Sequence, residues 1–163
     1  MKRNAFFVVL MLVLCSVSGF GQEKFSAKVK VIVQHDSKSV VDTMYSYITR
    51  ELRSLNDVTI VSDNEDYKIN LLMLDVTVGG RLVGYAVSTT FLQPAKCTYK
   101  QQYLNGTPVV LDCISIQGSY IVVVPSDKLK ENAQQIVVDF DTSILKTDRE
   151  FFDLNNKYKK KQS

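Results

Sequence analysis

Histidine is almost missing from this chain, which has a single one, His35, among 163 residues. An imidazole metal site needs several ligands, so a lone histidine beside Asp36 predicts a loop residue that helps a helix to start. The alternative is a general base or metal ligand at a strand end. The sequence also has no Gly-x-Ser-x-Gly elbow, no His-Glu-x-x-His pair and no phosphate-binding glycine loop. We therefore expect no enzyme, no cofactor and no bound metal.

An apolar run long enough to span a membrane is missing too. The run from Ala5 to Cys15 is shorter than the ~20 residues that a spanning helix needs. It follows Lys2 and Arg3 and leads into small residues, which is typical of a signal peptide at 1–21, cut before Gln22 or alternatively before Gly19. The bulky Leu14 before Cys15 argues against a lipid anchor. We expect export to the periplasm or beyond, with no transmembrane segment in the mature chain.

An excess of one charge is absent from the mature chain. Without Lys2 and Arg3, the 20 basic residues become 18 against 17 acidic ones, a net charge of +1. This balance argues against a nucleic-acid binder. The one basic cluster, within 156–163, predicts a disordered, solvated tail, with surface binding as the alternative. The rest, 22–155, is long enough for a single domain.

Cysteine is scarce, and only Cys97 and Cys113 remain after processing. An even number in an oxidising compartment predicts a disulfide between them. A two-residue turn at 105–106 would pair Cys97 with Ile114 and forbid the bond, because Cys113 would point to the other face. A three-residue loop, Leu104 to Gly106, would place the two cysteines opposite each other and allow it.

The patterns that are present predict an α+β fold. Alternation over 28–34 indicates a strand, helical spacing from Asp36 or Ser37 through Leu55 a helix, and 58–61 a second strand parallel to the first. Gly79-Gly80 predicts a tight hairpin turn. Pairing Val78 with Arg81 would then build the core face from residues 72, 74 and 76 opposite 87, 85 and 83, leaving the face of Ile69, Leu71 and Met73 mixed.

The later segments complete this sheet. We expect Pro94 to end the hairpin, a further hairpin to pair 96–104 with 107–116, and a last strand over 120–124. Ser126 then caps a helix that continues through Phe152. The prediction is a single mixed, mainly antiparallel sheet of about five to six strands with two helices packed on it, in the order β-α-β-β-β-β-β-α.

Two groups of side chains are candidates for a site. The acidic loop Asp63, Glu65 and Asp66 lacks the ligand spacing of a calcium loop and predicts a solvated turn. Tyrosines near the third hairpin are a possible binding surface, with cross-strand packing as the alternative reading. They are Tyr99, Tyr103 and Tyr120.

The segments Glu51-Leu52-Arg53 and Asp66-Tyr67-Lys68-Ile69, within residues 27–92, resemble the amino-terminal domain of TolB-like envelope proteins. The propeller that follows in that family is missing. The resemblance implies an envelope-associated interaction module without an active site.

The leading hypothesis is thus an exported, non-enzymatic module that binds a protein or envelope component. The alternatives are a secreted small-ligand-binding or inhibitor protein and a hydrolase that uses His35. A large apolar cavity on the face of Ile69, Leu71 and Met73 would favour a ligand, and a filled face would favour protein contact. The oligomeric state stays open.

Overall fold

The computed structural model describes residues 24–100 and 108–162, without the side chains of 96–100, 108–112, 161 and 162. The predicted signal peptide at 1–21 and the turn at 105–106 lie outside this range. Among the described residues, no helix is long and apolar enough to cross a bilayer.

One mixed sheet of five strands forms the centre of the molecule, in the spatial order β2-β1-β3-β4-β5. The strands are β1 (Ala27–Gln34), β2 (Val58–Ile60), β3 (Tyr67–Val78), β4 (Arg81–Lys100) and β5 (Pro108–Pro125). β1 runs parallel to β2, as predicted, and also parallel to β3, while β3, β4 and β5 are antiparallel. The predicted α+β class with a mainly antiparallel sheet is confirmed.

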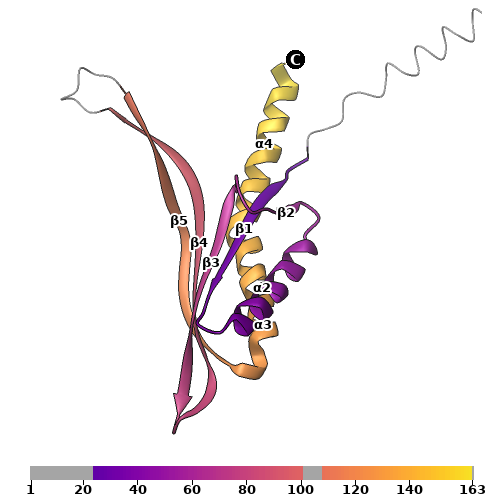
Figure 1. Ribbon diagram of the computed structural model, residues 1–163. Coiled ribbons are helices and arrows are strands. Elements are labelled where there is room, and N and C mark those ends of the chain that lie inside the picture. The colour runs from indigo at the N-terminus through magenta and orange to yellow at the C-terminus, as the bar shows by residue number, and fades with distance from the viewer. Residues whose placement is uncertain (1–23, 101–107, 163) are drawn as a thin grey trace, which may run out of the picture.

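Helices cover one face of this sheet and leave the other uncovered (Figure 1). α2 (Lys38–Arg53) begins after Ser37, one of the two expected cap residues, whose side chain makes no capping hydrogen bond, and ends two residues earlier than predicted. After the short turn η1 (Ser126–Lys128), α3 (Leu129–Phe140), the π-helical turn η2 (Asp141–Leu145) and α4 (Lys146–Gln162) follow one another directly. The predicted stripe from Leu129 to Ile144 is buried as expected.

The basic carboxyl-terminal segment is helical, so the prediction of a disordered tail at 156–163 is wrong for residues 156–162. Proline and glycine are absent after Pro125, so no residue type in this stretch interrupts the helix. The lysines of this segment also lie in the last turns of α4, where positive charge complements the helix dipole.

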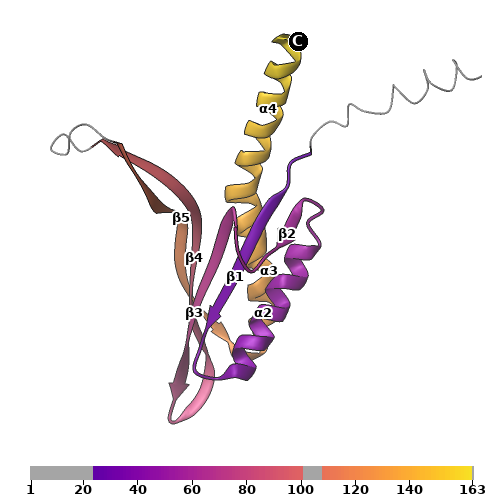
Figure 2. The ribbon, with the colours of Figure 1, turned by 45° about the horizontal axis from the view of Figure 1, so that its top comes forward.

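The outer strands are longer than predicted. Their ends past the pairing with β3, residues 93–100 and 108–115, form an arm that curves away from the helices (Figure 2). Pro94 does not end β4, which continues to Lys100, and the two strands predicted at 107–116 and 120–124 are one strand, β5. β3 pairs with β4 only as far as Leu92, so Pro94 has a neighbouring strand on one side alone. A strand edge of this kind tolerates the missing N–H of proline.

On β3 the core face of the β3–β4 hairpin is the opposite of the predicted one, while Tyr85 and Val87 of β4 are buried as predicted. Val78 does pair with Arg81 across the turn, where Gly79 and Gly80 have φ angles of 58° and 77°. A bulge then pairs Val76 with Gly84, and every later pair shifts by one residue. Such a slip changes which β3 side chains share a face with the buried residues of β4. The predicted mixed face of Ile69, Leu71 and Met73 is therefore the buried one.

Arg149 links α4 to the loop between α2 and β2. Its Nε and Nη2 donate to the two carboxylate oxygens of Asp57 over 2.5 and 2.9 Å, and its Nη1 lies 2.7 Å from Asp141 Oδ1. The Arg149 hydrogen bond lowers the pKa of Asp57, and the same bond raises the pKa of Arg149. Nearby, the Tyr67 hydroxyl donates to Asp148, whose pKa is raised by burial.

Replacing Arg149 with methionine should lower the free energy of unfolding by roughly 1–2 kcal/mol at neutral pH, because a forked, partly buried ion pair is lost. Asp57 has a lowered pKa in the folded state, so its contribution is present above its unfolded pKa and disappears as the pH falls through the folded value. The difference between wild type and variant should therefore shrink below about pH 4. Asp148 is present in both proteins, so its titration contributes equally to both free energies of unfolding and does not affect their difference.

Urea unfolding over a pH series measures this difference. Arg50→Met is the control, because Arg50 is half exposed and pairs with its neighbour Glu51, so its removal should cost little at any pH. A pH-independent Arg149 difference would contradict the prediction.

Candidate binding surface

The uncovered face of the sheet carries a continuous group of exposed apolar side chains. Cross-strand pairing aligns Leu74 with Ala86 and Val123, and Leu72 with Ser88 and Ile121. Lys68, which lies between two buried residues of β3, aligns with Leu92 and Ile116 on this same face. We define the open face by six residues with exposed fractions of 44–75%: Leu72, Leu74, Ile114, Ile116, Ile121 and Val123.

The covered face has no comparable opening around its centre. Ile69, Leu71 and Met73 are at most 1% exposed, and they pack among the buried residues of α2 and α3. Side chains of the protein itself therefore fill the position where an apolar cavity would have favoured a small ligand. A filled face at this position was expected to favour protein contact.

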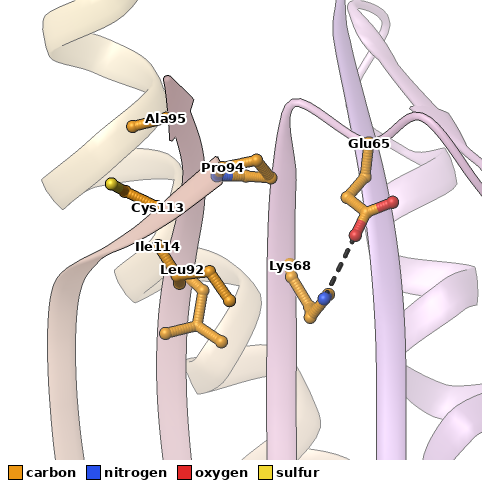
Figure 3. Close-up of a pocket in the computed structure, with 7 residues that line it drawn as sticks. All are labelled: Glu65, Lys68, Leu92, Pro94, Ala95, Cys113 and Ile114. Atoms are coloured by element: carbon orange, nitrogen blue, oxygen red, sulfur yellow. Dashed lines mark ion pairs between the residues drawn. The ribbon is translucent and has the colours of Figure 1, made fainter. Parts of the chain in front are cut away.

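A hollow of about 380 Å³ lies at one end of the open face, near the arm (Figure 3). Leu92, Pro94 and Ile114 supply apolar surface, and Lys68 Nζ lies 3.2 Å from Glu65 Oε1. A hydrogen bond from its own backbone, followed by the Lys68 contacts, lowers the pKa of Glu65. Because the two charges neutralise each other, the hollow offers mainly apolar contact with a polar border.

His35 has protein partners on both ring nitrogens. The Ser37 backbone N–H donates to Nδ1 over 2.9 Å, so Nδ1 accepts and Nε2 carries the proton that Asp75 Oδ1 accepts over 3.0 Å. The ring is 5% exposed and packs edge-on against Tyr85. Its contact with the cap residue of α2 is the helix-start role expected from the sequence, and Asp75 adds a link to β3.

The acidic loop residues each contact a different partner. Asp66 accepts the Lys28 backbone N–H over 2.8 Å, Glu65 pairs with Lys68, and Asp63 lies 3.7 Å from Lys30. The described part of the chain contains no group of three side chains arranged to hold a metal ion. These carboxylates connect the loop to β1 and β3.

Of the three candidate tyrosines, only Tyr120 has a described side chain. Its ring packs against Phe91 at 6.2 Å on the helix-covered face, and burial, with the nearby Asp139 carboxylate, raises the pKa of Tyr120 to about 12. Tyr99 and Tyr103 have side chains outside the described residues, so the tyrosine surface stays a prediction.

The cysteine pairing also stays a prediction. The loop register expected for the third hairpin is wrong, because Cys97 lies opposite Leu111 and Cys113 opposite Ala95. The difference is two residues, which keeps both cysteines on one face in diagonal positions. The side chain of Cys97 lies outside the described residues.

Sequence reasoning missed the open face. The apolar residues Leu72 and Leu74 were expected in the core, and Ile114, Ile116 and Ile121 were not singled out. The available signal was the uncharged segment 113–125, in which apolar residues occur on both faces of the strand.

Solved structures similar to this chain include two of low similarity. A PelC dodecamer from Paraburkholderia phytofirmans has a TM-score of 0.36 and 17% identity over 72% of this chain and 88% of that one. The rare lipoprotein B from Shewanella oneidensis has a TM-score of 0.20 and 12% identity over 83% and 99%. No protein-family profile and no curated protein matches this chain. At these scores the likeness carries no argument about function.

Proposed function

We propose that this chain is an exported, non-enzymatic module that binds a protein or envelope component through the open face. The observation that carries the proposal is the group of six large apolar side chains, 44–75% exposed, on a sheet face that none of the described helices covers. Scattered exposed apolar residues are ordinary, but a contiguous group of them is typical of an interaction site.

The charged border supports a protein partner. Lys30 of β1 and Lys68 of β3 lie opposite each other beside the open face, and each pairs with a carboxylate, Asp63 and Glu65 respectively. An apolar centre with a polar border is the usual composition of a protein interface. The amino-terminal segment that predicts export, and the resemblance to envelope interaction domains, suggest a partner in the envelope.

The second candidate is binding of a small apolar ligand at the hollow lined by Leu92, Pro94 and Ile114. Its volume of about 380 Å³ lies at the small end of the range for ligand pockets. A hydrolase that uses His35 has less support, because both ring nitrogens already have structural partners.

The test is capture of partners from an envelope extract by the immobilised mature chain. A reproducible partner should bind the wild type and be lost with the double variant Leu72→Lys and Leu74→Lys, because two charges would be buried in the interface. Val138→Lys is the matched control: Val138 is 51% exposed on α3, away from the open face, and its variant should still capture the partner. Absence of any reproducible partner, or equal loss with the control, would contradict the proposal.

A further inference from the structure

β5 is an edge strand, and within its segment 113–124 a bulge at Gln117 is the only described feature of the kind that normally protects an edge. It is last in the sheet order and pairs with β4 alone, so its other backbone edge has no strand partner among the described residues. From Cys113 to Pro125 the strand has no charged residue, and the one proline of this segment is its final residue; Pro108 and Asp112 lie in the earlier part of β5. Edge strands of monomeric proteins usually have lysines, inward charges, prolines or a covering segment, because an open edge accepts another strand.

The side chains along this edge are also exposed. Ile114 and Ile116 are 61% and 67% exposed, Ile121 and Val123 are 75% and 64%, and Ser115 and Gln117 between them are exposed as well. Isoleucine and valine favour paired strands, because their branched side chains pack across neighbouring strands. Such a segment is a template for strand addition.

The order of these residues is nearly symmetrical about Ser119. Two apolar residues, Ile114 and Ile116, precede it, and two others, Ile121 and Val123, follow it on the same face. They share that face because β5 has a bulge: Phe91 pairs with Gly118 and Leu92 with Ile116, which leaves Gln117 as the extra residue. Without this extra residue, even-numbered and odd-numbered positions would point to opposite faces.

From this symmetry and the absence of charge we propose that β5 pairs antiparallel with β5 of a second copy, around a twofold axis at Ser119. In this register Ile116 lies opposite Ile121 of the second copy and Ile114 lies opposite its Val123, and each pair occurs twice. Residues near the twofold axis lie close to their own counterparts in the second copy, so charges there would repel each other, and the segment 113–125 has no charged residue.

The pairing joins the two sheets into one and makes the two open faces continuous. It concerns the β5 edge, and the residues Leu72 and Leu74 that test the proposed function lie two strands away on β3. The two proposals can therefore fail separately: the double variant at positions 72 and 74 should lose its envelope partner and remain a dimer.

Sedimentation velocity of the purified mature chain over a wide concentration range tests the pairing. The wild type should have twice the mass of one chain. The double variant Ile116→Lys and Ile121→Lys places lysine opposite lysine at two symmetrical positions and should weaken the dimer about a hundredfold. The double variant Ile116→Lys and Ile121→Glu places opposite charges across the same pairs and should dimerise again.

Val78→Lys is the matched control, because Val78 is 67% exposed at the tip of the β3–β4 hairpin and away from the β5 edge. It should leave the dimer intact, and circular dichroism should show that all variants are folded. A wild type that is a monomer at every concentration would overturn the proposal. So would a lysine double variant that still dimerises, a lysine–glutamate variant that stays monomeric while folded, or a foreign strand that occupies the edge of a monomeric wild type.

Discussion

Replacing Phe140 with alanine should lower the free energy of unfolding by ~3–5 kcal/mol. Phe140 is fully buried at the end of α3, and its ring lies 5.6 Å from those of both Tyr67 on β3 and Phe91 on β4. The side chain thus joins the helical layer to two strands, and its removal leaves a cavity with aromatic walls. Urea unfolding followed by circular dichroism measures the loss.

The control for Phe140→Ala is Phe151→Ala. Phe151 is the same residue type on α4 and is 61% exposed, so its truncation should change the free energy of unfolding by less than about 0.5 kcal/mol. Similar losses for the two variants would mean that Phe140 does not hold the layers together in solution.

Gly84→Ala should cost about 3 kcal/mol through a backbone collision. A Cβ at this position would lie 2.3 Å from the Val124 carbonyl oxygen and 3.1 Å from the Pro125 Cα. Both are backbone atoms of β5, so no side chain can rotate away and the strands must separate. The loss should appear as a lower urea midpoint with reduced protection of the amides of β4 and β5 around residues 84 and 125 in hydrogen exchange.

Gly118→Ala is the matched control on the same pair of strands. There the added Cβ meets the Phe91 ring at 3.5 Å, an ordinary contact. Alanine also reduces the freedom of the unfolded chain, so the change should be close to neutral or slightly stabilising. Equal destabilisation by the two variants would show that any side chain at a glycine of this hairpin is harmful, and that the collision at Gly84 is not special.

Much of the fold was predictable because its signals are local. The stripe from Leu129 to Ile144 repeats at helical spacing, the segment 28–34 alternates, and Gly79-Gly80 supplies the positive φ angles that the turn needs. Each signal depends on residues close together in the chain, so the helices, the parallel β1–β2 pair and the α+β class follow from the sequence.

The errors arose where a distant segment decides the outcome. The bulge at Val83 of β4, opposite Val76 and Thr77, shifts the register by one residue, and alternation within either strand does not predict it. Pro94 remains inside β4 because β3 ends its pairing at Leu92, which is a property of the assembled sheet. Both cases depend on pairing between strands, whose partners local patterns do not identify.

In the candidate site, too, local contacts were predictable and contacts between distant segments were not. His35 at the start of α2 was expected from its position, but its bond to Asp75 joins residues 40 positions apart. Leu72 and Leu74 of the open face were misplaced into the core, because alternation predicts two faces for a strand without saying which one the helices will cover.

By itself, the sequence determined the elements of this protein, their turn chemistry and the absence of recognisable catalytic motifs, since these depend on neighbouring residues. Only the tertiary structure decided which face of the sheet is buried, how far β4 and β5 extend and that the uncharged segment 113–125 lies at an open edge. The physical reason is that burial and strand pairing are set by where distant segments meet, and a one-residue bulge is enough to exchange the buried face for the exposed one.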